Sequence, residues 1–153
     1  MMPLIAVGTD APDFDVMTST GNPFRLSDLR GTLRAMLVFY PKDFTPGCTD
    51  QLVEVRNNVE FIREVETEPI GVNPDDAASH EKFRTTYELP FDLLVDEDRK
   101  IAEAYGSLKE DGVGIQRSVI VVGKNGRIIY SSEGAPAWQI VCNAIRAADD
   151  AIA

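Results

Sequence analysis

One cysteine stands where its neighbours would change its chemistry. Cys48 follows Thr45, Pro46 and Gly47, and an apolar run from Ala35 to Tyr40 comes shortly before them. Thr45 is a good N-cap and Pro46 suits the first position of a helix, so the thiol is expected in a first turn. Unpaired backbone N–H groups and the helix dipole favour the thiolate there. The segment therefore predicts an activated thiolate at Cys48.

The use of such a thiolate depends on the groups around it. Nucleophilicity falls with pKa, so the rate must come from stabilising a leaving group. For a peroxide, donors are needed around two oxygens in line, and backbone N–H groups, the Thr45 hydroxyl and a guanidinium would supply them. The alternative is a cysteine that only fills space, with Thr45 as a cap and Pro41 as a strand stop. Taken one at a time, these residues leave both interpretations open.

The composition limits the class of protein. The chain has 153 residues, 44% of them hydrophobic, which suits one compact domain over residues 1–153. A net charge of -10 argues against binding nucleic acid or an anionic membrane. No apolar run approaches the roughly 18 residues of a membrane span, and no secretory leader is recognisable, so we expect a cytoplasmic protein. Its two cysteines would be thiols there.

Short apolar runs alternate with amphipathic segments, which is the pattern of an α/β sheet. Strands are expected at Leu33–Tyr40, Pro69–Asn73, Asp92–Asp96, Ser118–Val122 and Arg127–Ser131. Helices are expected at Gly47–Glu64, Asp75–Glu88, Arg99–Tyr105 and Pro136–Ile152.

Local signals refine this outline. Asn73 is expected to cap the second helix, with Pro74 at its first position, and Asn125-Gly126 indicates a two-residue hairpin. An N-terminal extension contains the turn "TSTGNP". The order predicts a thioredoxin-like α/β fold, in which a mixed central sheet is flanked by helices on both faces and ends in an antiparallel hairpin and a covering helix.

The spacing Pro41-x-x-x-Thr45-x-x-Cys48 matches the signature of the peroxiredoxins. The segment "FYPKDFTPGCT" closely resembles the bacterioferritin comigratory protein, or peroxiredoxin Q, group. The segments "GTDAPDF", "SHEKF", "LPFDLLVDEDRKIAEAYG" and "QRSVIVVGKNGRI" look like the same group. The resemblance covers nearly the whole chain.

The resemblance implies a role for each matching residue. Cys48 would be the peroxidatic cysteine, which peroxide converts to a sulfenic acid. Thr45 would hydrogen-bond the thiolate and the peroxide, and Pro41 would shield the pocket from water. Arg117, just before the strand "SVIVV", matches the family's active-site arginine; as a permanent cation it would favour the thiolate and the developing oxyanion.

The sequence also departs from this group. Gln51 and Arg56 fit its pattern as scaffolding, and Gln51 is a candidate to orient a basic residue. The usual resolving cysteine would stand at Val53, or alternatively near Phe83, and neither position holds one. The local disulfide route is therefore absent.

The second thiol, Cys142, lies beside a stripe of Trp138, Val141, Ile145 and Ala148 at helical spacing. This favours a packed, inert thiol. We therefore favour a one-cysteine cycle, in which a thioredoxin-like or small external thiol reduces Cys48. The alternative is a two-cysteine cycle with Cys142 resolving, which would need the two Cα atoms within about 7 Å.

Other functions fit less well. A cysteine hydrolase needs a base beside Cys48, and the only histidine is His80. A dithiol oxidoreductase needs Cys-x-x-Cys, but Gln51 occupies the second position. No cluster suits a metal, so we expect neither metal nor cofactor. The non-enzymatic rival is a binding protein or holdase on the same fold. We expect peroxide and a thiol reductant as partners, and a monomer or weak homodimer.

Overall fold

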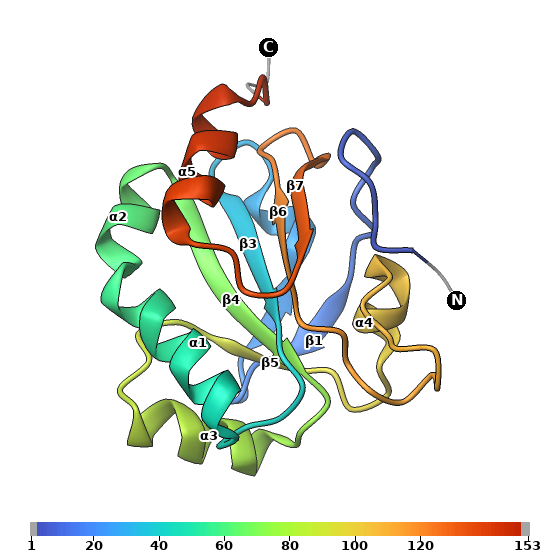
Figure 1. Cartoon of the computed structure of the whole chain (residues 1–153), viewed down its shortest axis with the longest axis vertical. Coiled ribbons are helices and arrows are strands. Elements are labelled where there is room, and N and C mark those ends of the chain that lie inside the picture. Colours follow the sequence, from blue (N-terminus) through green and yellow to red (C-terminus); the bar gives the residue numbers. More distant parts are fainter. Residues whose placement is uncertain (1–2, 151–153) are drawn as a thin grey trace.

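Five strands form a mixed sheet in the order β5-β4-β3-β6-β7 (Figure 1). The computed structural model of the chain describes residues 3–150. These strands are β3 (Arg34–Phe39), β4 (Thr67–Asn73), β5 (Leu93–Val95), β6 (Ser118–Val122) and β7 (Ile128–Glu133). Strands β4 and β5 extend the sheet from β3 in parallel, and β6 and β7 extend it antiparallel. The predicted mixed sheet with a C-terminal hairpin is confirmed.

Five α-helices and an N-terminal hairpin surround this sheet in the described part of the chain. The helices are α1 (Pro46–Asn57), α2 (Val59–Glu64), α3 (Ala77–Thr86), α4 (Lys100–Tyr105) and α5 (Trp138–Ala147). The hairpin pairs β1 (Asp15–Met17) with β2 (Pro23–Arg25), and the short 3-10 helix η1 (Leu26–Leu29) follows it. The turn expected in "TSTGNP" connects β1 and β2, where the Gly21 amide donates to the Thr18 carbonyl at 3.0 Å.

The central strand β3 separates two hydrophobic cores, because its side chains alternate between the two faces of the sheet. Ala35, Leu37 and Phe39 lie in one core, and Met36, Val38 and the next residue after the strand, Tyr40, lie in the other. The first core includes Tyr105 of α4 and is covered in part by Phe24 of the hairpin; we call it the α4-side core. The second includes Leu52 of α1, Phe83 of α3 and Ile145 of α5; we call it the α1-side core. Helices therefore cover both faces (Figure 1).

The register of β3 against β6 brings two distant segments together. Phe39, the last residue of β3, lies opposite Ser118, the first residue of β6. The loop that leads into α1 and the segment that ends at Arg117 therefore emerge at the same end of the sheet.

The predicted helix Gly47–Glu64 is wrong in its length, because two helices occupy this segment. Asn58 separates α1 from α2, and its side-chain amide donates to the Glu54 carbonyl at 2.9 Å. Its backbone amide donates instead to the Val55 carbonyl at 3.1 Å. Such local bonds of asparagine compete with the regular helical ladder.

Two predicted caps and turns also differ. Helix α3 begins at Ala77 with Asp76 as its N-cap, whereas Asn73 was expected to cap; the Asp76 carboxylate accepts from the Ser79 amide at 2.8 Å. Asn73 instead ends β4. In the β6–β7 hairpin residues 123–126 form a turn that is closed by the Gly126 amide, which donates to the Gly123 carbonyl at 2.9 Å. Gly126 is the fourth residue of this turn and has a φ of 81°, whereas the φ of Asn125 is not positive. A two-residue Asn-Gly turn would need positive φ at both residues.

The predicted helix Pro136–Ile152 is also too long. Helix α5 ends at Ala147, and Ala148 is extended; Ile152 lies outside the described residues. Beyond this extended residue, the Asp150 carboxylate accepts from the Arg34 guanidinium at the start of β3 at 2.6 and 2.9 Å. It also accepts from the Lys124 amide, between β6 and β7, at 3.0 Å. Asp150 is 2% exposed. It therefore ties the end of the described chain to β3 and to the β6–β7 hairpin.

We expect Asp150→Asn to lower the free energy of unfolding at pH 7 by about 2 kcal/mol, because it weakens charge-assisted hydrogen bonds. Burial raises the pKa of Asp150, but the Arg34 and Lys124 hydrogen bonds outweigh it and hold the pKa below 3.8. The stabilisation is thus present above that pH and is lost as the pH falls through the lowered pKa.

Urea unfolding of wild type and Asp150→Asn, from pH 7 down to about pH 3, measures this difference. The exposed neighbour provides the matched control, Asp149→Asn, which should unfold like wild type. Equal midpoints for all three proteins at pH 7 would refute the assignment.

Candidate active site

The first turn of α1 holds the candidate nucleophile. Thr45 is the N-cap residue and Pro46 begins the helix, as predicted, and Cys48 is 1% exposed. The Thr45 hydroxyl makes no capping bond; it donates backward to the Lys42 carbonyl at 3.0 Å. The first-turn amides are thus left without a side-chain cap beside the sulfur, and a free thiol lies among them.

Arg117 joins this turn from the start of β6. Its Nη2 lies 3.3 Å from the Cys48 Sγ, and its Nη1 donates to the Gln51 Oε1 at 2.5 Å. A Cβ at Gly47 would stand 3.4 Å from the same Nη2, so the guanidinium lies close over the helix backbone. The structure therefore places Arg117 beside Cys48, with its guanidinium hydrogen-bonded to Gln51. That Gln51 orients Arg117 stays a prediction.

The other predicted residues lie around this centre. Pro41 is half-buried and begins the loop that follows Tyr40. Arg56 is a scaffold residue, because its Nη1 donates to the Tyr87 carbonyl at 2.8 Å and joins α1 to the end of α3. The catalytic parts assigned to Cys48, Thr45, Pro41 and Arg117 stay predictions.

Cys142 is separate from the centre. It lies in the middle of α5 and is 8% exposed, and both cysteines are free thiols. The two are not near each other.

The histidine that a hydrolase would need is engaged elsewhere. The imidazole of His80 is fully buried, and its two nitrogens lie 2.7 Å from the Asp43 carboxylate and 2.9 Å from the Leu94 carbonyl. Within residues 3–150 these are its hydrogen-bonding partners, so it is not paired with Cys48.

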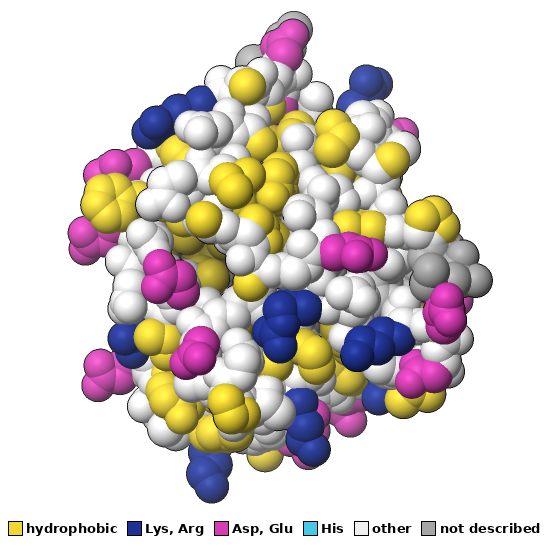
Figure 2. All heavy atoms as spheres, in the orientation of Figure 1, with side chains coloured by type: hydrophobic (Ala, Val, Ile, Leu, Met, Phe, Trp, Pro, Cys, Tyr) yellow, Lys and Arg dark blue, Asp and Glu magenta, His cyan; other side chains and the backbone are white. Residues whose placement is uncertain are grey.

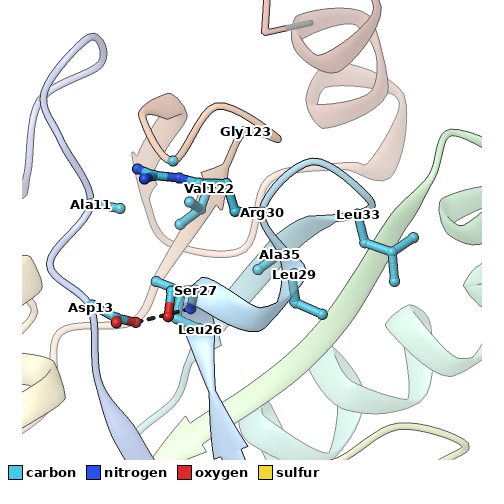
Figure 3. Close-up of a pocket in the computed structure, with 11 residues that line it drawn as sticks. Ala11, Asp13, Leu26, Ser27, Leu29, Arg30, Leu33, Ala35, Val122 and Gly123 are labelled. Carbon is cyan, nitrogen blue, oxygen red and sulfur yellow. Dashed lines mark hydrogen bonds between the residues drawn. The ribbon is translucent and has the colours of Figure 1, made fainter. Parts of the chain in front are cut away.

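Two hollows lie on opposite faces of the sheet. The pocket in Figure 3 includes Ala35 at the start of β3 and Val122 at the end of β6, far along both strands from Cys48. Asp13 closes its rim by accepting from the Ser27 amide at 2.9 Å. The pocket therefore does not belong to the thiol site.

The second hollow, which we call the apolar hollow, lies beside the thiol site. Its lining includes Met36, Gln51, Val55, Val119, Ala135 and Trp138. Hydrophobic side chains gather on this face of the molecule between α1–α2 and α5 (Figure 2). The Gln51 Nε2 is buried and has no hydrogen-bonding partner among residues 3–150.

Residues 3–150 contain no group of three His, Cys, Asp or Glu side chains arranged to hold a metal ion. None of the helices in this part of the chain has the length and apolar character needed to cross a membrane.

A helix-terminal cysteine with an arginine on its sulfur, carried by this mixed sheet, defines a thiol-active protein of thioredoxin-like fold. Residues 7–131 match the AhpC/TSA family, and the chain belongs to that family. It is 40% identical to peroxiredoxin Bcp of Bacillus subtilis (strain 168) over 131 residues, which are 82% of this chain and 83% of the relative. The predicted resemblance to the peroxiredoxins is confirmed.

More distant relatives agree. The chain is 37% identical to the chloroplastic peroxiredoxin Q of Oryza sativa subsp. japonica over 136 residues, or 86% of this chain; it spans 62% of that relative, less than two thirds. The crystal structure of a cysteine-to-serine mutant of Xylella fastidiosa PrxQ superposes with a TM-score of 0.84 at 26% identity and covers 96% of this chain and 97% of that one. The predicted thioredoxin-like fold is confirmed.

We expect Gln51→Leu to slow alkylation of Cys48 by iodoacetamide at pH 7 by roughly fivefold, equivalent to about 1 kcal/mol, because Arg117 loses its acceptor. Gln51→Glu keeps an acceptor and should react like wild type. A Cys142→Ser background makes the assay report Cys48 alone. Gln139→Leu, on the exposed side of α5, is the control. If Gln51→Leu reacts as fast as this control, Gln51 does not orient Arg117.

Proposed function

We propose that this chain is a thiol-dependent peroxidase that reduces hydrogen peroxide and organic hydroperoxides through Cys48 in a one-cysteine cycle. The observation that carries the proposal is the 3.3 Å contact between the Arg117 Nη2 and the Cys48 Sγ in the first turn of α1. A fixed guanidinium at this distance stabilises negative charge on sulfur and then on oxygen.

In the oxidative half of the cycle the Cys48 thiolate attacks one oxygen of the peroxide. The O–O bond breaks, and the second oxygen leaves with the bonding electrons as hydroxide or alkoxide, which takes up a proton to give water or an alcohol. Cys48 is left as a sulfenic acid. Arg117 faces the developing charge, the Thr45 hydroxyl turns from the Lys42 carbonyl toward the peroxide, and Pro41 limits the access of water.

In the reductive half an external thiol attacks the sulfenic sulfur and displaces water, which leaves a mixed disulfide. A second thiol then breaks that disulfide and returns Cys48 as a thiol, so two thiols supply the two electrons that one peroxide takes. The separation of Cys142 from Cys48 supports an external reductant, which we take to be a thioredoxin-like protein or a small thiol.

The apolar hollow supports organic hydroperoxides as substrates. Gln51 belongs to both places, because its Oε1 holds Arg117 and its side chain lines the hollow. An alkyl group in the hollow would remove apolar surface from water while its peroxide reaches the thiolate. The unpartnered Gln51 Nε2 is available to an oxygen of such a substrate.

Two serine variants test the cycle. Cys48→Ser should reduce peroxide consumption to background, because the attacking sulfur is gone, whereas Cys142→Ser should turn over like wild type with thioredoxin or with dithiothreitol. Mass spectrometry after one equivalent of peroxide should find Cys48 as a sulfenic acid or a mixed disulfide. A Cys48–Cys142 disulfide would overturn the one-cysteine cycle, and consumption that survives Cys48→Ser would overturn the enzyme assignment in favour of a binding protein.

Filling the apolar hollow tests the substrate class. Ala135→Leu should lower kcat/KM for cumene hydroperoxide by roughly tenfold, the effect of about 1.4 kcal/mol, and leave kcat/KM for hydrogen peroxide unchanged. The matched control is Ala137→Leu, two residues further along the chain, likewise exposed and outside the lining of the hollow. If both peroxides lose rate in parallel, the hollow does not select organic substrates.

A further inference from the structure

The loop of residues 41–45, which joins β3 to α1, contains a buried carboxylate. Asp43 is 4% exposed, and its carboxylate is hydrogen-bonded to four side chains. These partners are Tyr40 Oη at 2.7 Å, Asn73 Nδ2 at 3.1 Å, Ser79 Oγ at 2.8 Å and His80 Nδ1 at 2.7 Å. They come from Tyr40, the residue directly after β3, and from β4 and α3, so one carboxylate in the loop connects three parts of the fold.

The partners of His80 determine its protonation. Its Nδ1 faces the Asp43 carboxylate, and its Nε2 faces the Leu94 carbonyl of β5 at 2.9 Å. Both partners are acceptors, and a neutral imidazole has only one N–H to donate. Because Asp43 is ionised, its pKa being lowered, the two bonds are satisfied together only by a doubly protonated ring. Asp43 and His80 therefore form a buried ion pair with both charges hydrogen-bonded.

The loop that this pair holds has an unusual backbone. Phe44, directly after Asp43, has a φ of 67°, which non-glycine residues rarely adopt. Its ring packs on Phe83 of α3, with centroids 5.1 Å apart. The Asp43 amide is held as well, because it donates to the Asp75 carboxylate at 2.8 Å. A second aromatic contact joins the Phe44 ring to Tyr87 at the end of α3, with centroids 6.2 Å apart. Polar bonds and two aromatic contacts thus fix the loop against α3 (Figure 1).

We propose that the buried Asp43–His80 ion pair is a positioning device for the Cys48 chemistry. By fixing the loop of residues 41–45 it fixes Pro41, Thr45 and the first turn of α1 in the geometry that peroxide attack requires. His80 touches neither the peroxide nor the sulfur and acts through Asp43. The inference rests on the proposed function, and it adds residues from α3 and β5 to the support of the site.

The pair carries a pH dependence. Burial lowers the pKa of His80, but the bond and charge of Asp43 outweigh it and raise the pKa above 6.5. Burial raises the pKa of Asp43, but His80 and the hydroxyl donors outweigh it and lower the pKa below 3.8. Both side chains are charged at a pH between the lowered pKa of Asp43 and the raised pKa of His80. The ion pair is lost as the pH rises through the raised pKa of His80.

Other titratable groups face the pair. Asp75, from the loop before α3, adds negative charge near both Tyr40 and His80. Burial and then the Asp43 charge raise the pKa of Tyr40 well above its ordinary value, so its phenol remains a neutral donor. The charge of Cys48 on α1 also raises the pKa of Tyr40, and its effect is smaller than those of burial and Asp43. Loss of the His80 proton is therefore the alkaline change that breaks the pair.

The protonation can be measured directly, since the chain has one histidine. A ¹⁵N spectrum of the imidazole in the full-length wild-type protein at pH 7 should show both ring nitrogens protonated. A ring with one protonated nitrogen at this pH would overturn the proposal. This readout requires neither a variant nor any peroxidase activity.

The positioning role is tested on Cys48 in a Cys142→Ser background. His80→Gln has a single amide group and cannot donate in both directions, so the loop should loosen. Oxidation of Cys48 by hydrogen peroxide at pH 7 should slow about tenfold. Alkylation of Cys48, which is 1% exposed in the wild type, by a bulky maleimide should accelerate by a similar factor. The control for general destabilisation is Ile101→Ala in the α4-side core. Equal rates for the two variants in both assays would overturn the proposal.

Asp43→Asn is the conservative rescue. Its amide NH2 can donate to the Nδ1 of a neutral His80 whose Nε2–H still donates to the Leu94 carbonyl, and its second N–H can donate to the Ser79 Oγ, which then accepts. The contacts are kept without either charge. We expect oxidation of Cys48 at pH 7 within about threefold of wild type, a neutral ring in the ¹⁵N spectrum, and no loss of rate attributable to His80 at alkaline pH. An Asp43→Asn rate as low as that of His80→Gln would show that the bonds alone do not position the loop, and would overturn this account.

The two proposals fail in different ways. If no variant and no wild-type protein is oxidised by peroxide, the proposed function is wrong. The imidazole spectrum and the maleimide rates then still decide whether the ion pair holds the loop.

Discussion

The antiparallel register of β3 and β6 is the constraint on which the thiol site depends. Phe39 pairs with Ser118, so the chain enters the loop toward α1 at the point where Arg117 enters the sheet. A slip of one residue would turn the side chains of β6 to the opposite face. Both faces are buried in separate cores, so such a slip would place the wrong set of side chains in each. Core packing therefore determines where the guanidinium meets the sulfur.

The apolar core and the polar bonds contribute differently to this site. Leu52 and Ile62 dock α1 and α2 on the sheet by hydrophobic burial, which is strong but not directional. The orientation of the first turn depends on directional hydrogen bonds instead. Arg117 donates to Gln51 of α1, and His80 is hydrogen-bonded to Asp43 in the loop before the helix. The loop with the left-handed Phe44 lies between them and is the part of the site that hydrophobic burial alone would not hold in one conformation.

What could be predicted from the sequence follows from the range of the interactions. The bounds of β6 and the helix start at Pro46 depend on neighbouring residues, and both were predicted correctly. The place of Arg117 was predicted from a family pattern. The burial of Asp43 and of Asp150 could not be predicted, because each depends on a cation far away in the chain: His80 and Arg34. In "YPKDFT" an aspartate that will be buried looks like one that stays in water.

The burial of Cys48 makes different demands on the two halves of a one-cysteine cycle. Cys48 is 1% exposed and its sulfur carries the Arg117 contact. A small peroxide needs little room, whereas a thiol must approach the sulfenic sulfur in line with the bond that it breaks. The attacking thiol therefore requires the first turn, or the loop before it, to move. Asp43 anchors that loop by polar bonds, which water can replace, while Leu52 and Ile62 stay buried. The contacts that prepare Cys48 for oxidation are thus the ones whose release sets the energetic cost of its reduction.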